Sequence, residues 1–222
     1  MQLSLKGVGK SYDGQQVLSD VSFALNDCGH ALLLGPSGSG KSTLLNIICG
    51  LQTPDAGTVQ IGDAIIASAD QVTNPDPIRK RSMGIIFQTL RLVSALNVRA
   101  NLALAQKLQT GAVDPALIDT TLERLGIMHR AAARPFELSQ GEAQRAAIAR
   151  ALVVKPQVLI ADEPTSALDH ANTQAVAELL LEVAKEAGAT LLVATHDDRL
   201  TPFFARTLTL DNGALTEGAL GA

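Results

Sequence analysis

The amino-acid sequence predicts an α/β fold with a mixed, largely parallel core sheet, an antiparallel β subdomain and an inserted helical subdomain. Three observations predict it. Apolar strands alternate with a helix in the C-terminal half, an order that implies parallel strands joined by right-handed crossovers. Residues 1–30 alternate like antiparallel strands, and residues 90–155 change to helical periods. With 222 residues the chain can bury one substantial core, so we expect a single domain over residues 1–222.

The N-terminal part predicts the antiparallel β subdomain. Its first strands flank Asp13-Gly14, a typical hairpin turn, and residues 58–61 and 64–66 flank a second turn signal, Gly62-Asp63. The proline-rich residues 74–77 then predict a loop before a strand at residues 83–87.

The middle of the chain predicts the helical subdomain, at about residues 90–155. Apolar side chains there recur at helical spacing, and Ser139 with Glu142 has the form of a capping box. We expect that box to open a helix that runs through Arg150 and is stopped by Pro156.

The remaining segments predict the parallel part of the sheet. An apolar strand at residues 158–161 is followed by an amphipathic helix at 171–187 and a second apolar strand at 190–195. Residues 207–210 and 214–216 flank Asp211-Asn212-Gly213 and predict a closing hairpin.

A glycine-rich loop follows the apolar strand at residues 31–34 and has the order G-x-x-x-x-G-K-[ST]. Glycines let successive backbone N–H groups turn inward on a phosphate, Lys41 can reach the β- and γ-phosphates, and the Ser42 hydroxyl can bind Mg²⁺. A helix expected over residues 43–48 would direct its dipole at the same phosphates. The predicted phosphate-binding residues are Gly35, Pro36, Ser37, Gly38, Ser39, Gly40, Lys41, Ser42 and Thr43.

Two carboxylates, Asp162 and Glu163, follow the strand at residues 158–161. Open α/β folds bind ligands at the carboxyl ends of parallel strands, so these side chains should face the phosphate loop. We expect Asp162 to hold Mg²⁺, through water, and Glu163 to orient the attacking water or accept its proton. An acidic pair at a strand end can also be merely solvated; the phosphate loop in the same chain favours the catalytic interpretation.

Further segments, in a characteristic order, make the chain resemble the ATP-binding-cassette (ABC) family of ATPases, and the resemblance covers essentially the whole chain. They are the signature-like Leu138-Ser139-Gln140-Gly141-Glu142, Gln88 after the strand at 83–87, Ser166-Ala167-Leu168-Asp169, His196 and Tyr12. The resemblance implies a P-loop NTPase that hydrolyses ATP with Mg²⁺. It implies that Gln88 binds Mg²⁺ and reports the γ-phosphate, that His196 contacts the γ-phosphate, and that Tyr12 stacks on adenine. Taken alone, each of these three could be an ordinary structural residue.

The same resemblance implies a partner. In this family the signature residues, here Ser139, Gln140, Gly141 and Glu142, contact ATP held by a second copy, so two chains enclose two ATP molecules head to tail. Asp169 ends the segment that matches the family's D-loop, and the resemblance implies that it belongs to the ATP-binding residues. This chain has Gln140 and Glu142 where the commonest signature has glycine and glutamine.

Composition sets the remaining expectations. A net charge of -4 gives no basic footprint, so nucleic acid is not an expected partner. Cys28 and Cys49 lack metal-site spacing and are expected to be reduced thiols. The N-terminus lacks the order of a signal peptide, and no uncharged apolar run approaches the ~18 residues that span a bilayer. For a chain without such a run, the resemblance to the ABC family implies separately encoded transmembrane subunits that hold it at the cytoplasmic face of the inner or plasma membrane.

The apolar residues 90–96 lie where the family receives a short helix from its membrane partner, although they could instead be a buried helix start. The length and the motifs around Gln88 and Ser139 favour the branch that resembles lipoprotein-release and macrolide-export ATPases. A non-transport regulator of a membrane complex, as in cell division, remains an alternative. A DNA-repair or translation cassette is disfavoured by the short chain, and a nucleotide kinase would not need residues 138–142 or Asp169.

Overall fold

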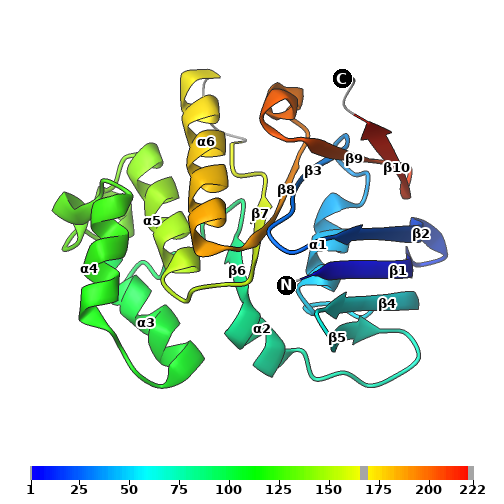
Figure 1. The fold of residues 1–222 in the computed structure, drawn as a ribbon, viewed down its shortest axis with the longest axis horizontal. Coiled ribbons are helices and arrows are strands. Elements are labelled where there is room, and N and C mark those ends of the chain that lie inside the picture. The colour runs from blue at the N-terminus through cyan, green and yellow to red at the C-terminus, as the bar shows by residue number, and fades with distance from the viewer. Residues whose placement is uncertain (1, 166–169, 220–222) are drawn as a thin grey trace.

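The computed structural model describes residues 2–165 and 170–219, which form two sheets and a group of helices (Figure 1). A four-stranded antiparallel sheet has the order β2-β1-β4-β5, and a six-stranded sheet has the order β10-β9-β3-β8-β7-β6. The strands of the first sheet are β1 Leu3–Tyr12, β2 Gln15–Leu25, β4 Ala56–Ile61 and β5 Ala64–Ser68. Those of the second are β3 His30–Leu34, β6 Met83–Ile86, β7 Val158–Asp162, β8 Thr190–Thr195, β9 Arg206–Asp211 and β10 Ala214–Ala219.

The six-stranded core sheet is largely parallel, because β6, β7, β8, β3 and β9 all run in one direction and only β10 pairs antiparallel. Successive residues of a strand point to opposite faces, and both faces here are apolar. Leu33 joins the core on the side of α1 (Lys41–Ile48), whereas its neighbour Leu32 joins the core on the helical side. These sheets confirm the predicted fold class.

The four-stranded sheet packs with α1 over one face of the core sheet, on the right in Figure 1. Leu3, Leu5, Val21 and Phe23, which alternate along their strands, are buried in this core as the pattern of period two predicts. A hydrophobic layer therefore fixes the start of α1 against both sheets, and it is this start that carries the glycine-rich loop.

Four helices of the described residues cover the other face of the core sheet, on the left in Figure 1. Along the chain, three of them come between β6 and β7, and the fourth follows β7. They are α3 Val98–Thr110, α4 Pro115–Arg124, α5 Gln140–Leu152 and α6 His170–Ala187. Short 3-10 helices occur at Met128–Arg130, Pro135–Glu137 and Asp198–Phe203. Side-chain caps begin three of the α-helices: Asn97 accepts from the N–H of Ala100, Asp114 from that of Leu117, and Ser139 from that of Glu142.

One local prediction and one local alternative are wrong. The sequence predicts a loop at residues 74–77, but α2 (Asp76–Ser82) begins there, with Pro77 in its first turn. Proline suits that place because its fixed φ matches the helix and its missing N–H is not needed. Residues 90–96 are also not a buried helix start: the next helix begins at Val98, and Val93, in the segment before it, is 42% exposed.

Candidate functional site

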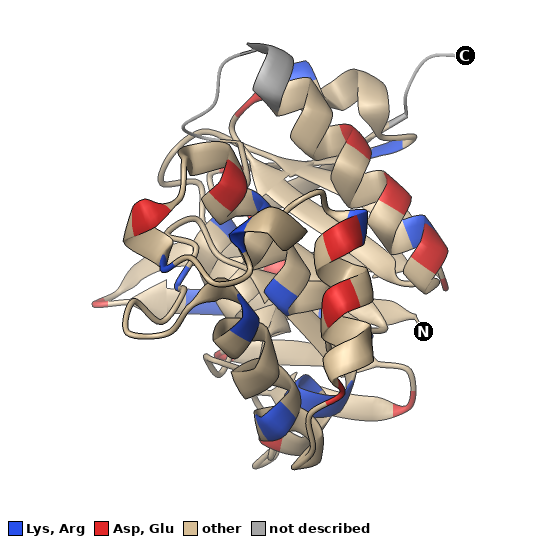
Figure 2. Cartoon of the chain, turned by 90° about the vertical axis from the view of Figure 1, so that its left-hand side faces the viewer, with Lys and Arg blue, Asp and Glu red and all other residues tan. Residues whose placement is uncertain are grey.

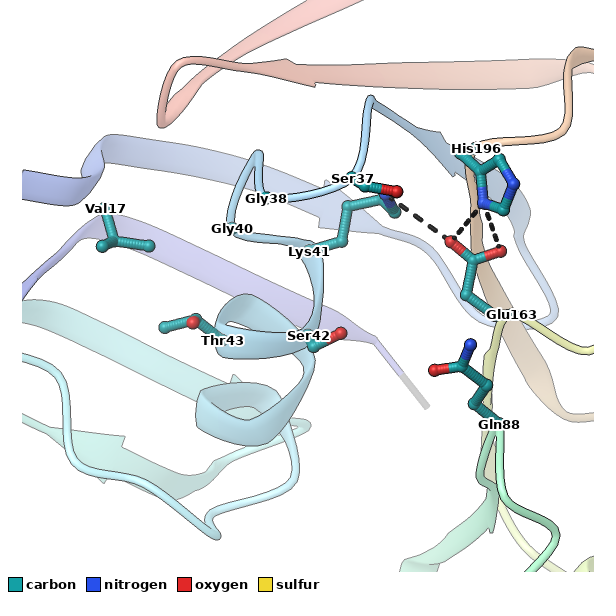
Figure 3. A pocket seen from close by; sticks show the side chains of 10 residues that line it. All are labelled: Val17, Ser37, Gly38, Gly40, Lys41, Ser42, Thr43, Gln88, Glu163 and His196. Atoms are coloured by element: carbon teal, nitrogen blue, oxygen red, sulfur yellow. Dashed lines mark hydrogen bonds and ion pairs between the residues drawn. The ribbon is translucent and has the colours of Figure 1, made fainter. Parts of the chain in front are cut away.

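A cavity of about 320 Å³ lies where β3, β7 and β8 end. This is the edge of a parallel sheet at which α/β folds bind ligands. Figure 3 shows Lys41 and Glu163 facing each other across it, with Gln88 below Glu163. The lining residues are Val17, Ser37, Gly38, Gly40, Lys41, Ser42, Thr43, Gln88, Glu163 and His196.

The loop between β3 and α1 forms one wall of this cavity. Gly38 and Gly40 have φ values of 83° and 102°, which L side chains rarely adopt. A Cβ on Gly40 would also lie 2.9 Å from the Val17 carbonyl oxygen, so glycine is required there on two grounds. Gly40 offers α1 no side-chain cap, and Lys41, Ser42 and Thr43 line the cavity, so the unpaired N–H groups of the first turn are available to an anion there.

Lys41, the first residue of α1, supplies a cation to the same wall. Its side chain is only 6% exposed, and Nζ donates to the carbonyl oxygens of Gly35 at 2.7 Å and Pro36 at 3.1 Å. Nζ also lies 3.6 Å from Oε1 of Glu163. A buried ammonium at the uncapped N-terminus of a helix makes this wall strongly attractive to phosphate.

Glu163 forms the opposite wall, one residue beyond β7. Its φ of 48° is unusual for a residue with a side chain, and its backbone N–H is fixed by the Ala194 carbonyl oxygen at 2.8 Å. The carboxylate accepts from the Thr195 hydroxyl at 3.0 Å and lies 3.0 Å from Nδ1 of His196. The turn and these contacts hold a carboxylate, 10% exposed, against Lys41 and facing into the cavity.

Asp162, the last residue of β7, has the environment of a metal-binding carboxylate. Burial raises its pKa, as does the charge of Glu163, while a hydrogen bond from the Ser42 hydroxyl opposes the rise. Its Oδ1 atom is buried and has no hydrogen-bond partner. An orphaned carboxylate oxygen beside a serine hydroxyl fits Mg²⁺, which prefers oxygen ligands and few protein groups. Within residues 2–165 and 170–219, no cluster of three or more His, Cys, Asp or Glu side chains could hold a metal by itself.

The structure does not bring every predicted residue to this cavity. Gly35, Pro36 and Ser39 of the loop, and also Asp162, are not among the residues that line it. Tyr12 ends β1 with 39% of its surface exposed and with the Lys10 ammonium 5.6 Å from the ring centre, so its contact with adenine stays a prediction. Asp169 lies outside the described residues.

The signature-like residues lie at the start of α5 and line no part of this cavity. Ser139 and Glu142 exchange two hydrogen bonds: the Ser139 N–H donates to the carboxylate at 2.8 Å, and the Glu142 N–H donates to the hydroxyl at 3.3 Å. A Cβ on Gly141 would meet no atom of the chain within 4 Å. The N–H groups of Ser139 and Glu142 are thus paired within the turn, and the space beside Gly141 is left open at the N-terminus of α5, an end that attracts anions.

Two residues of the site escaped the sequence reasoning. Val17 lies in residues 1–30, which the sequence predicts only as antiparallel strands, yet it lines the cavity from β2. Thr195, the last residue of β8, belongs to a segment that the sequence predicts only as an apolar strand, yet its hydroxyl fixes Glu163. A hydroxyl directly before His196 at a strand end was the available signal for Thr195; Val17 had none.

Comparison with known proteins agrees with this geometry. The family model described as ABC transporter matches residues 18–166. The lipoprotein-releasing system ATP-binding protein LolD of Shewanella oneidensis is 40% identical over 222 residues, which cover 96% of this chain and 95% of that protein. LolD of Pseudomonas syringae pv. tomato is 37% identical, with 97% of each chain covered.

Solved structures extend the likeness to the fold. The dimeric structure of MJ0796, a bacterial ABC transporter cassette, has a TM-score of 0.88 and 32% identity, with 99% of both chains covered. A dimeric post-hydrolysis structure of MJ0796 bound to ADP and Pi has the same TM-score, identity and coverage. The predicted family and the predicted lipoprotein-release branch are both confirmed by these relatives. This chain belongs to the ABC transporter family and is an ATP-binding and ATP-hydrolysing cassette.

Proposed function

We propose that two copies of this chain close around two ATP molecules and that hydrolysis reopens them, driving separately encoded membrane subunits at the cytoplasmic face of the membrane. One observation carries the proposal: Glu163 is fixed opposite Lys41 and the glycine-rich loop, within a cavity that residues 139–142 of the same chain do not reach. One face of a bound γ-phosphate would thus have no contact with its own chain, and residues of the second copy could bind it.

The cavity residues divide the chemistry between them. The loop N–H groups and Lys41 bind the phosphates, and Glu163 takes the proton of the attacking water. Thr195 and His196 hold the Glu163 carboxylate in place, and His196 is half exposed beside it, where it can donate to the γ-phosphate. Ser42, Asp162 and Gln88 are the oxygen-bearing side chains proposed to hold Mg²⁺, which would neutralise phosphate charge.

The second copy is proposed to complete the site with the first turn of α5. The space beside Gly141 is clear of its own chain's atoms, so a phosphate held by another copy could approach the first turn of α5 there. The N-terminus of a helix favours phosphate, because unpaired N–H groups and the helix dipole both attract an anion. The two solved structures of the MJ0796 cassette are both dimeric, which supports the same arrangement for this chain.

If each site needs two copies, ATP turnover depends on protein concentration. We expect the specific activity of the purified chain to rise as its concentration is raised through the range in which dimers form. Phosphate release per chain, measured over a broad dilution series, checks this. Specific activity that stays constant from the most dilute sample, where light scattering shows monomers only, would contradict the shared site.

A groove of about 430 Å³ is the proposed docking surface for the membrane subunit. It lies between α2, β6, α3 and α5, next to residues 90–96, and we propose residues 90–155 as the helical subdomain that forms one side of it. Leu51 and Leu108 line it with 47% and 62% of their surfaces exposed. Large exposed apolar side chains in a groove are typical of partner binding.

The basic side chains of the docking surface favour a partner segment that carries acidic residues. The lining of the groove includes Arg79, Lys80, Arg91 and Arg150. Figure 2, which faces the helical side of the molecule, shows both basic and acidic residues on the helices there, so the basic preference rests on the lining of the groove itself. A partner segment with apolar and acidic side chains would match this groove.

No helix among the described residues is long and apolar enough to cross a membrane. The LolD relatives, named as parts of a lipoprotein-releasing system, suggest lipoprotein release as the task of the assembled complex.

We expect Leu108→Asp to abolish co-purification with the membrane subunit while the isolated chain keeps its ATP turnover. Leu108 is exposed, so the charge does not enter the core, but it removes an apolar contact and adds a negative charge to the groove. Val113→Asp, at a residue 42% exposed outside the groove, is the matched control. Pull-down of the Leu108→Asp chain at the level of the control would show that the groove is not the docking surface.

A further inference from the structure

The start of α5 contains a carboxylate at a place proposed to receive a phosphate. Glu142 is the third residue of the helix, and one of its oxygens accepts the Ser139 N–H at 2.8 Å. A helix N-terminus attracts anions with roughly half a unit of positive charge. A full negative charge in the same turn would cancel that attraction, and the commonest signature of the family has a neutral glutamine there.

Arg130 supplies the missing positive charge. Its Nε atom lies 3.1 Å from Oε1 of Glu142, and the guanidinium also donates to the carbonyl oxygen of Glu137. The imidazole Nε2 of His129 lies 3.4 Å from the same carboxylate oxygen. Arg130 therefore joins the 3-10 helix Met128–Arg130 to both ends of the turn that leads into α5.

The ionised state of Glu142 is favoured at this place. The hydrogen bond from the Ser139 N–H lowers its pKa most, and the charge of Arg130 lowers it further; desolvation opposes them with a smaller effect than that hydrogen bond. Because Arg130 is 33% exposed and Glu142 24% exposed, solvent screens this pair, and its worth for the stability of the fold is small. The larger consequence is local: the pair makes the turn electrically close to neutral.

We propose that Arg130 is a positioning residue for ATP hydrolysis: it neutralises Glu142 and holds the Ser139 turn so that α5 can receive the γ-phosphate bound to the partner copy. This rests on the proposed function of the signature residues. A purely structural role for Arg130 would hold the turn without regard to the charge at residue 142. The two roles therefore separate when that charge is removed.

The test uses the full-length Glu163→Gln chain, in which ATP is not consumed. Dimer mass is followed by light scattering as ATP with Mg²⁺ is titrated. We expect Arg130→Ala to raise the ATP concentration for half-maximal dimerisation on the order of tenfold. Adding Glu142→Gln to that variant keeps the capping hydrogen bond without the charge, and we expect it to restore most of the loss. Binding of ATP to the monomer should be the same in both, because Arg130 does not line the cavity.

Arg124→Ala is the matched control, since it removes an arginine of similar exposure, 36%, whose ion pair with Glu186 lies away from the turn. The inference is overturned if Arg130→Ala dimerises like the control, or if Glu142→Gln fails to restore dimerisation. The second result would assign Arg130 to the fold of the turn alone. A Glu163→Gln chain that binds ATP yet stays monomeric would instead contradict the proposed function, and this inference with it.

Discussion

Replacing Glu163 by glutamine is expected to lower ATP turnover by roughly 10²- to 10⁴-fold, the usual contribution of a general base. Glutamine has nearly the same shape and can still accept from the Thr195 hydroxyl, so the cavity should keep its form. It cannot take the proton of the attacking water. ATP should therefore bind and remain, and the closed dimer should accumulate.

Steady-state phosphate release checks this expectation, with Glu178→Gln as the control. Glu178 is an exposed carboxylate on α6 that accepts from Gln174, far from any proposed chemistry. We expect the control to keep full turnover. If Glu163→Gln hydrolyses ATP as fast as the control does, Glu163 is not the general base. His196 would then be the next candidate for that role.

Lys41→Ala is expected to weaken ATP binding roughly 10- to 100-fold, because a charge-assisted contact to phosphate contributes more than a neutral one. In the chain itself Nζ bridges Gly35, Pro36 and Glu163, and each of these contacts is lost with it. The loss leaves Glu163 without its nearest cation, which further disfavours an anion in the cavity.

Isothermal titration with ATP and Mg²⁺ measures this effect directly. Lys107→Ala, which removes an exposed lysine near the end of α3, is the control and should bind as the unaltered chain does. Circular dichroism should show the same helix content in both variants. Binding by Lys41→Ala as tight as by Lys107→Ala would show that the glycine-rich loop does not hold the phosphates through this side chain.

The sequence is a good guide wherever a single local pattern decides the structure. The apolar run at residues 158–161 is compatible only with a buried strand, and the glycine-rich residues after residue 34 only with a loop that leads into a helix. Both form as predicted. The prolines at 75 and 77 mislead, because proline both ends helices and begins them, and only the packing of α2 against its neighbours shows which applies.

The site is harder to foresee than the fold, because it is made by the meeting of distant segments. The motifs mark Lys41, Gln88, Glu163 and His196, and the structure brings all of them to one cavity. The support of Glu163 by Thr195 depends on the register between β7 and β8, which no local pattern states. The ion pair between Arg130 and Glu142 likewise depends on how the 3-10 helix Met128–Arg130 packs against the start of α5.

The most direct test of the shared site is the mass of the Glu163→Gln chain in solution with and without ATP. Size-exclusion chromatography with light scattering should give 23.2 kDa without ATP and twice that mass with ATP and Mg²⁺. A variant that also carries Ser139→Ala should need more ATP to reach the same mass. A chain that binds ATP and stays at 23.2 kDa at every ATP concentration would contradict the account.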